Sequence, residues 1–353
     1  MNKIDRYIAS SVLWAFLIVI FVLLGLDYAL TFIDKIKQVD DHYPISSLLQ
    51  VLFFRLPGKL AQYIPIASLI GTLMGLGTLA STSELTVMRA AGMPIWRIGL
   101  AACQPILLVS LIGLAISEYV APVAEQKANL IEQIRDQQDT NFALTGGVWL
   151  KADKKFVYIN AADNTGKLYG IIVYTPENET LKRVIRADTA THKAGNQWIL
   201  HNARETLFFP DHTEAKSFKT MDWSVSIKPE HLFLASQDPD SLSLSQLSNY
   251  KNYLEAQHQD ASQYALEFWQ KALRPLGSLA LVLVALSSVF GPLRSSTMGG
   301  RIFSGVMIGL AFQNGLNLFG QMSVAAHFPP VIGVSIPIVL CTLAALYLMR
   351  RKG

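Results

Sequence analysis

Six stretches of about twenty apolar residues lie along the chain, in two groups of three. They cover residues 11–32, 64–81, 98–117, 276–293, 302–326 and 328–349, and Asp27 is the only charged residue within them. A bilayer core of roughly 30 Å needs about 20 apolar residues in a helix, whose backbone polar groups are then paired internally. The pattern therefore predicts six transmembrane helices. No small-residue cleavage site follows the first segment, so we expect an uncleaved anchor rather than a signal peptide.

The region between the two groups, residues 123–274, is polar and has the pattern of a separate domain. Runs rich in Val, Ile, Tyr, Phe and Trp predict strands at residues 147–150, 155–160, 168–174, 183–187, 197–201, 205–209 and 222–227. No helical pattern separates these strands, which favours an antiparallel sandwich or a partly open barrel such as a β-jellyroll. Flanking helices are expected at residues 125–138 and 245–271, with Asp260 as a candidate N-cap.

The predicted fold class is thus an α-helical membrane protein with six transmembrane helices, arranged 3+3, and an inserted all-β domain of β-jellyroll type. The first three transmembrane helices occupy residues 1–122, the inserted domain residues 123–274, and the last three transmembrane helices residues 275–353. Orientation follows from the distribution of Lys and Arg, which are concentrated on the cytoplasmic side of membrane proteins. One side has nine such residues against two acids: Lys3, Arg6, Arg89, Arg97, Arg294, Arg301, Arg350, Arg351 and Lys352. Both termini are therefore expected in the cytoplasm, with the inserted domain on the opposite side of the membrane.

Composition narrows the function classes further. Only 16% of the residues are charged and 51% are hydrophobic, whereas soluble domains carry about 25% charged residues. An ordinary cytosolic enzyme and a disordered chain are therefore excluded, and the modest net charge of +4 gives no reason to expect nucleic acid as a partner. Cys103 and Cys341 both lie in predicted spans, so no disulfide is expected in the inserted domain.

The motifs of common catalytic sites are missing from the sequence. There is no G-x-x-x-x-G-K-[ST] phosphate loop, no H-E-x-x-H and no paired C-x-x-C, and the seven His residues show no metal-ligand spacing. We find no nucleophile and base in a convincing arrangement. The sequence therefore predicts a non-enzymatic protein that binds no cofactor or metal of its own.

The most informative cytoplasmic stretch lies between the second and third apolar segments, at residues 83–94. Ser83 can cap a short helix and Gly92 followed by Pro94 can end it, while Glu84 favours the positive end of the helix dipole. Such a helix is either a connector resting at the membrane surface or a docking helix for a cytoplasmic partner. The residues alone leave both interpretations open.

Several motifs resemble the LptF/LptG family of lipopolysaccharide export permeases, over essentially the whole chain. The order of three spans, β-jellyroll and three spans matches the family, and residues 83–93 resemble its coupling helix. Within the family, residues 290–294 with Met298, Gly299 and Arg301 resemble the LptG branch more than the LptF branch. The other matching motifs are Ile4-Asp5-Arg6-Tyr7-Ile8 and Phe32-Ile33-Asp34-Lys35-Ile36-Lys37.

The resemblance implies a permease subunit of an ABC transporter in the bacterial inner membrane. Its partners would be LptF, an LptB ATPase dimer that uses ATP and Mg, and LptC, with membrane lipids around them. The complex would extract lipopolysaccharide from the inner membrane and pass it to a periplasmic bridge toward the outer membrane. The coupling helix implies ATPase contacts through Glu84, Leu85, Met88 and Arg89.

The same resemblance implies where the substrate binds. Basic residues just beyond the first span contact lipopolysaccharide in the family, which indicates Lys37 and Lys35 here, although Thr31 and Gln38 stand where the family pattern has Lys. Charge complementarity adds two cations beyond the third span, and apolar residues of the fifth span can supply a wall for acyl chains. These further candidates are Lys127, Arg135, Phe312, Leu316 and Phe319.

Other polar residues near the spans have less specific interpretations. Arg55, Lys59, Lys271 and Arg274 can bind phospholipid headgroups or the substrate. Asp27 is a candidate contact to LptC or LptF, or a carboxylate that reaches the interface. Gln313, Asn317 and Gln321 form one stripe, for interhelical hydrogen bonds or a gate. Small residues allow close helix approach at Gly71, Gly75, Gly77, Gly305 and Gly309.

Three other identities were weighed against this one. The chain could be the sibling subunit LptF, a membrane-anchored periplasmic binding or scaffold protein without a transport role, or a MacB-like mechanotransmission permease. The motif at residues 290–294 argues against LptF, and six spans exceed the one or two anchors that a scaffold needs. The balanced 3+3 layout argues against the third.

Overall fold

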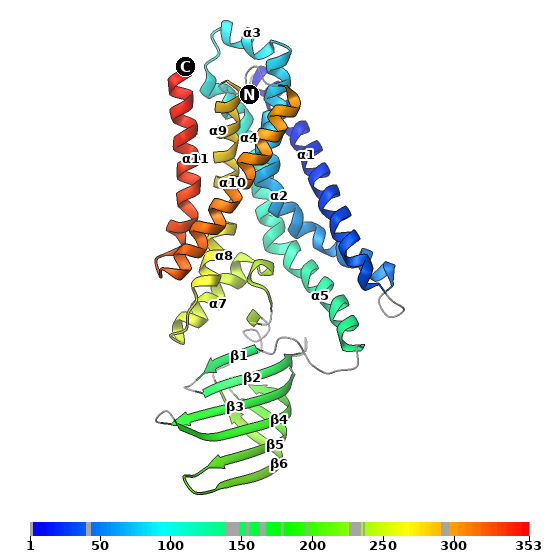
Figure 1. The fold of residues 1–353 in the computed structure, drawn as a ribbon, viewed down its shortest axis with the longest axis vertical. Coiled ribbons are helices and arrows are strands. Elements are labelled where there is room, and N and C mark those ends of the chain that lie inside the picture. The colour runs from blue at the N-terminus through cyan, green and yellow to red at the C-terminus, as the bar shows by residue number, and fades with distance from the viewer. Residues whose placement is uncertain are drawn as a thin grey trace. The chain divides into compact units, whose positions relative to one another are not determined.

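A computed structural model describes residues 3–39, 44–138, 148–152, 155–162, 167–177, 180–194, 197–225, 234–235, 237–290 and 297–352. The chain divides into two compact units. One consists of Met1–Gln138, Ser243–Leu247 and Ser262–Gly353, and the other of Asp139–Leu242 and Ser248–Ala261. The first is helical and the second contains the β-sheet (Figure 1).

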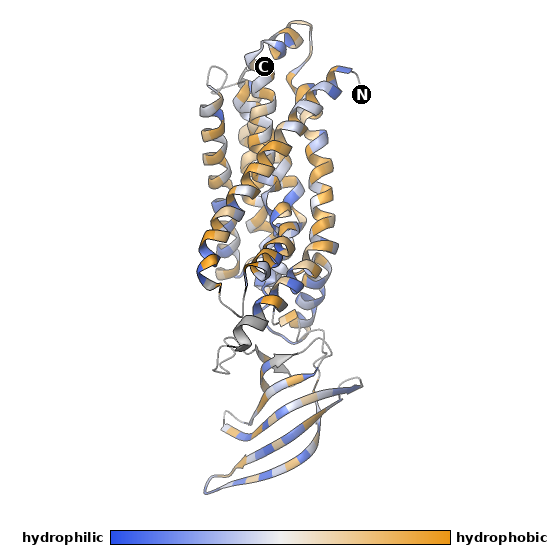
Figure 2. Cartoon of the chain, turned by 90° about the vertical axis from the view of Figure 1, so that its right-hand side faces the viewer, coloured by the Kyte–Doolittle hydropathy of each residue, from blue (hydrophilic) through white to orange (hydrophobic). Residues whose placement is uncertain are grey.

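The helical unit is built from long apolar helices with the chain termini at one end (Figures 1 and 2). Its N-terminal half comprises α1 (Lys3–Lys35), the 3-10 turn η1 (Ile36–Gln38), α2 (Ile45–Ser81), α3 (Glu84–Ala90), α4 (Ile95–Ala115), the π-helical turn η2 (Ile116–Val120) and α5 (Ala121–Gln138). Its C-terminal half comprises α8 (Ser262–Ala272), α9 (Arg274–Val289), α10 (Met298–Ala325) and α11 (Pro330–Lys352).

Among the described residues, five helical segments are long and apolar enough to cross a membrane. They are Lys3–Lys35, Ile45–Ser81, Ile95–Asn129, Met298–Ala325 and Pro330–Arg350. The fourth predicted span, residues 276–293, corresponds to α9, which has only 16 residues. It reaches spanning length together with α8, from which it is bent by 51°, and that pair would make a sixth span. The prediction of several apolar helices is therefore confirmed, with five candidate spans by length and composition and a sixth if the bent pair is one span.

The helical core is centred on α2, which packs against α1, α4, α9 and α10. A Cβ atom added to Gly71 would lie 2.6 Å from the Cα of Phe16, and one added to Gly75 would lie 2.9 Å from the Cα of Val12. Both distances are too short for any side chain, so α1 and α2 approach backbone to backbone at these glycines. The predicted role of Gly71 and Gly75 in close helix approach is confirmed.

The second unit contains one antiparallel sheet in the order β1-β2-β3-β4-β5-β6 (Figure 1). Its strands are β1 (Val148–Ala152), β2 (Lys155–Ala162), β3 (Leu168–Glu177), β4 (Thr180–Ala194), β5 (Gln197–Phe208) and β6 (Thr213–Ser224). One hydrophobic core includes Val157, Val173, Ile185, Trp198 and Trp223. Buried apolar residues alternate along much of β2, β3, β4 and β5, which places them on one face of the sheet, whereas β6 buries only Trp223.

The antiparallel all-β prediction is confirmed, but two details differ. The predicted strands at 197–201 and 205–209 are one continuous strand, β5, because the register with β6 is the same at His201 and at Ala203, on either side of Asn202 with its φ of 53°. The described strands form a single up-and-down sheet, so the two sheets of a jelly roll are not found among them. The last predicted strand, 222–227, is the end of β6, and residues 226–227 lie outside the described residues.

The predicted helix at 245–271 is wrong as a single element. It consists of α7 (Leu244–Ala256) and α8, after the 3-10 turn η3 (Pro239–Ser241). His258 adopts a φ of 53°, and the amide of Gln259 donates to the carbonyl of Leu254, which closes the end of α7. Asp260 lies two residues before the start of α8, one position too early for an N-cap.

Candidate functional site

Charged side chains from three helices meet at the end of the helical unit opposite the chain termini. The ammonium of Lys35, at the end of α1, pairs with Glu132 of α5. Arg55 of α2 donates from Nε to Glu125 at 2.9 Å and from Nη2 to Glu132 at 2.8 Å, with a weaker bond to Asn129 at 3.4 Å. We call these five residues the ionic cluster. All four charged side chains are only 18–25% exposed, so solvent screens their interactions incompletely.

An apolar cluster from the same three helices holds them in place. Leu48, Val51 and Leu52 of α2 are buried against Ala128 of α5. On α1, the hydroxyl of Tyr28 donates to the carbonyl of Leu52 at 2.9 Å. Because these contacts fix α1, α2 and α5 together, the ionic cluster has a defined geometry.

The predicted substrate cations fall into two groups. Lys35 is neutralised by Glu132, whereas Lys37 in η1 is exposed and makes no ion pair within the described part of the chain. Lys127 is also exposed, with its ammonium 5.7 Å from the ring centroid of Phe54. The side chain of Arg135 lies outside the described residues. Lys37 and Lys127 are thus the predicted cations that an incoming anion meets first.

Sequence reasoning missed the carboxylates of the ionic cluster. Glu125, Asn129 and Glu132 follow one another at spacings of four and three residues, which places them on one face of a helix. That spacing was the available signal. It showed a polar stripe, although it did not show that Lys35 and Arg55 from other helices cover the stripe.

Asp27 has its partners within this chain. The hydroxyl of Tyr63 donates to its carboxylate at 2.9 Å, and the ammonium of Lys59 lies 3.4 Å from it. Both residues belong to α2, so α2 of this chain already pairs with Asp27, and the contact of Asp27 with LptC or LptF stays a prediction. Lys59 is likewise engaged with Asp27.

Part of the predicted apolar wall on α10 is buried in the core of the helical unit. Phe312 is 4% exposed and packs against α9, where a Cβ on Gly277 would lie 3.3 Å from its ring. Phe312 is therefore not exposed to an acyl chain in this conformation, and its role in substrate contact stays a prediction. Leu316 packs against the same core and is partly buried, and Phe319 is half-buried.

The polar stripe of α10 makes no hydrogen bond to another helix among the described residues. Gln313 is half-buried, and Asn317 and Gln321 are exposed. Asn314, beside them, donates to the carbonyl of Leu310 in its own helix at 2.9 Å. The predicted hydrogen bonding between helices is therefore not found in the part of the chain that the structure describes.

The predicted coupling helix is present as α3, and it begins differently from the prediction. Ser83 adopts a φ of 63° and its side chain caps nothing, so its predicted role as a side-chain N-cap is wrong. Thr82 instead donates its hydroxyl to Glu84 at 2.9 Å. Gly92, with a φ of 85°, ends the helix as predicted, and the amide of Met93 donates to the carbonyl of Met88.

The exposed face of α3 differs from the predicted contact set. Leu85 is 2% exposed and belongs to the helical core, so it anchors α3 and is not available to a partner. Met88 is partly buried against the same core, whereas Val87 is 66% exposed. The guanidinium of Arg89 lies 5.8 Å from the ring centroid of Phe290. Glu84 and Arg89 remain candidate contacts, and Val87 joins them.

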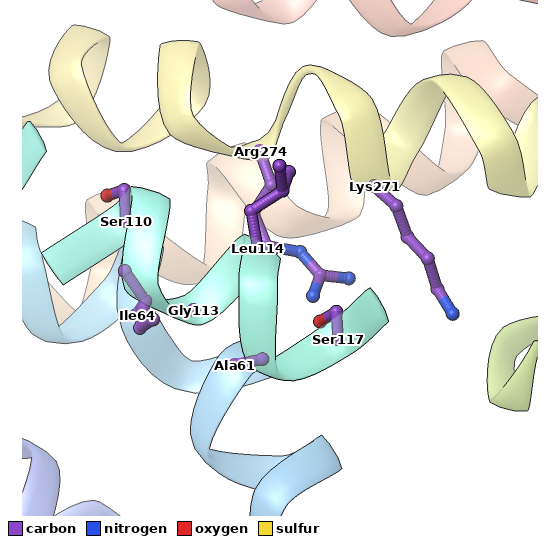
Figure 3. Close-up of a pocket in the computed structure, with 8 residues that line it drawn as sticks. All are labelled: Ala61, Ile64, Ser110, Gly113, Leu114, Ser117, Lys271 and Arg274. Atoms are coloured by element: carbon purple, nitrogen blue, oxygen red, sulfur yellow. The ribbon is translucent and has the colours of Figure 1, made fainter. Parts of the chain in front are cut away.

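A small cavity lies where α2, α4 and η2 meet the bend between α8 and α9 (Figure 3). In Figure 3 the side chain of Arg274 reaches past Leu114 toward Ser117, while Lys271 points elsewhere. The cavity has about 10 Å³ of space, enough for roughly one water molecule. Lys271 is only 7% exposed, and the hydroxyl of Ser110 has no hydrogen-bond partner among the described residues. A cavity of this size suits a bound water and is too small for a lipid headgroup.

Two further polar residues have structural roles that the sequence did not indicate. Glu118, in the π-helical turn, accepts from the amides of Leu244 and Ser245 at 2.8 and 3.3 Å and thereby caps the start of α7. Arg301 of α10 is 3% exposed and donates to the carbonyl of Gly77.

The described residues contain no group of three or more His, Cys, Asp or Glu side chains placed to hold a metal ion.

Comparison with known proteins identifies the family to which this chain belongs. The profile of the family described as "Lipopolysaccharide export system permease LptF/LptG" matches residues 6–351. The chain belongs to the LptF/LptG family. It is 32% identical to the lipopolysaccharide export system permease protein LptG of Escherichia coli K12 over 354 residues, which cover 99% of this chain and 98% of that protein. It is 30% identical to LptG of Haemophilus influenzae over 355 residues, covering 100% and 99%.

Membership of the LptF/LptG family excludes two of the three alternative identities, the periplasmic scaffold and the MacB-like permease. An LptF/LptG protein is a permease, the membrane component of the lipopolysaccharide export system, so the scaffold without a transport role and the MacB-like permease are excluded. The similarity to LptG proteins from two organisms also favours the LptG branch over LptF.

Proposed function

We propose that this chain is the LptG-type half of a permease that extracts lipopolysaccharide from the inner membrane and passes it to a periplasmic bridge. LptF supplies the other half and LptC joins the complex. An LptB dimer hydrolyses ATP with Mg, since the sequence carries no phosphate loop. The observation that carries the proposal is the pair of exposed cations, Lys37 and Lys127, at one end of an apolar bundle in an export-permease family.

The orientation proposed for the chain follows from charge. Nine Lys and Arg residues belong to the termini and to the short sequence segments between spans on the same side, so the positive-inside rule assigns the end of the bundle that carries the termini and α3 to the cytoplasm. The ionic cluster and the β-sheet unit are then on the periplasmic side. In this orientation α3 faces the cytoplasm, where Glu84, Val87 and Arg89 can contact LptB.

The proposed binding region offers both cations and an apolar surface, which match the two chemical parts of lipopolysaccharide. Lipopolysaccharide carries phosphates, which pair with Lys37 and Lys127, and acyl chains, which need an apolar surface. Leu316 and Phe319 of α10 are the candidates left for that surface, since Phe312 is in the core.

Charge reversal at the exposed cations tests the proposal. In proteoliposomes containing the whole complex, Lys37→Glu and Lys127→Glu are expected to lower lipopolysaccharide release roughly tenfold, the factor for about 1.4 kcal/mol. ATP turnover should stay within about twofold, since neither residue is near α3. Lys219→Glu, a reversal at an exposed lysine of β6, is the matched control and should release lipopolysaccharide normally. Unchanged release in both test variants would remove the two lysines from the substrate path.

A further inference from the structure

The ionic cluster contains its own anions. Lys35 and Arg55 supply two positive charges from α1 and α2, and Glu125 and Glu132 supply two negative charges from α5. Glu132 is the central member, because it pairs with Lys35 through Oε1 and with Arg55 through Oε2. The cluster is therefore neutral, and Glu132 occupies the positions that an external anion would take beside both cations.

We propose that Glu132, assisted by Glu125, is a resident counter-anion that a phosphate group of the substrate displaces from Lys35 and Arg55. The inference rests on the proposed function and deepens it, because it names residues that control when the second pair of cations becomes available. Glu132 is a positioning residue in this scheme and does not itself touch the substrate.

The exchange is reasonable on charge and geometry. A phosphate carries up to two negative charges and three acceptor oxygens, against one charge and two oxygens for Glu132, so it can satisfy both cations together. The four charged side chains are 18–25% exposed, which keeps the attraction strong while leaving a route for an anion from solvent. Lys37 follows Lys35 by two residues and is exposed without an ion pair in the described part of the chain, so it is placed to receive the anion first.

The exchange would also change how the helices are linked. Both cations are on α1 and α2, and both carboxylates are on α5. When a phosphate replaces Glu132, α5 loses its ionic link to α1 and one of its two ion pairs with Arg55 of α2. The Glu125–Arg55 pair and the apolar cluster of Leu48, Val51, Leu52 and Ala128 still hold the helices together. Substrate arrival thus loosens α5 without separating it.

Removing the charge of Glu132 tests the proposal. Glu132→Gln keeps the size of the side chain and one acceptor oxygen for Arg55 but no longer competes for the cations. In nanodiscs holding the whole complex, binding of radiolabelled lipopolysaccharide should become roughly three- to tenfold tighter. Glu125→Gln should give a smaller gain, because Glu125 pairs with Arg55 alone among the cluster cations. Adding Lys35→Gln to Glu132→Gln should remove most of the gain.

The β-sheet of the same chain supplies a matched control, and the variants also define the results that would contradict the proposal. Glu205→Gln removes a carboxylate that pairs with Arg183 in the β-sheet, and it should leave binding unchanged. If Glu132→Gln and Glu125→Gln both assemble and bind no tighter than the wild type, the carboxylates only fasten the helices and the inference is wrong. If Glu132→Gln fails to assemble, Glu125→Gln decides alone. Failure of the proposed function would look different, since the wild-type complex itself would then not bind lipopolysaccharide.

Discussion

At the scale of single residues, Gly71 sets the distance between α1 and α2. A Cβ at this position would meet the Cα of Phe16 at 2.6 Å, and a backbone atom cannot turn aside as a side chain can. We expect Gly71→Ala to destabilise the protein by about 1–3 kcal/mol through overpacking. Thermal unfolding of the purified complex measures this. Gly25→Ala, on α1 with no atom within 4 Å of the added Cβ, is the control and should unfold at or above the wild-type temperature.

Single residues also show where prediction from the sequence stops. The close approach at Gly71 was predictable because small residues in apolar spans have few other uses. The pairing of Lys35 with Glu132 was not, because the two are 97 positions apart and meet only when α1 and α5 both pack against α2. Phe312 shows the same limit, since its helix alone does not reveal whether it faces lipid or α9.

At the scale of elements, the short helix α3 has one face buried in the helical core and another face exposed to a partner. Val87 is 66% exposed and Leu85, two positions before it, is 2% exposed. Val87→Asp should therefore reduce co-purification of the LptB dimer, because it places a charge on the proposed contact, while the permease stays folded. Leu85→Ala should instead lower the unfolding free energy by roughly 2–5 kcal/mol. Equal LptB recovery with Val87→Asp and the wild type would contradict docking through this face.

Elements were predictable where their pattern is long and regular, and not where local backbone geometry decides. The apolar spans predicted α1, α2, α4, α10 and α11, although α2 begins 19 residues before the predicted segment, at Ile45. The break after α7 depends on the left-handed conformation of His258, a residue with no special tendency to end a helix. Similarly, Asn202 gave the appearance of a gap between two strands that the structure joins.

At the scale of the whole molecule, the sequence predicted two groups of apolar helices that flank an antiparallel β region along the chain. It could do so because helices and strands have different hydrophobic periods. The arrangement of strands was harder, since alternation fixes which face of a strand is buried and not which strand lies next to it. The order β1 to β6 joins neighbours in sequence throughout the described sheet, a simpler topology than the predicted jelly roll.

The topology of the whole chain in the membrane is the broadest prediction that remains. From the nine Lys and Arg residues of the termini and of the short segments on the same side, we expect the termini and α3 in the cytoplasm and the β-sheet unit in the periplasm. In a background with Cys103→Ala and Cys341→Ala, we expect Lys219→Cys on β6 to react with a membrane-impermeant maleimide in spheroplasts. Val87→Cys on α3 should react only after the membrane is permeabilised. Both sites are exposed in the folded chain, so a gain of Val87→Cys labelling on permeabilisation reports the membrane barrier and not burial within this chain. The reverse pattern of labelling would put α3 on the wrong side for a cytoplasmic ATPase and would overturn docking, orientation and the periplasmic placement of the ionic cluster together.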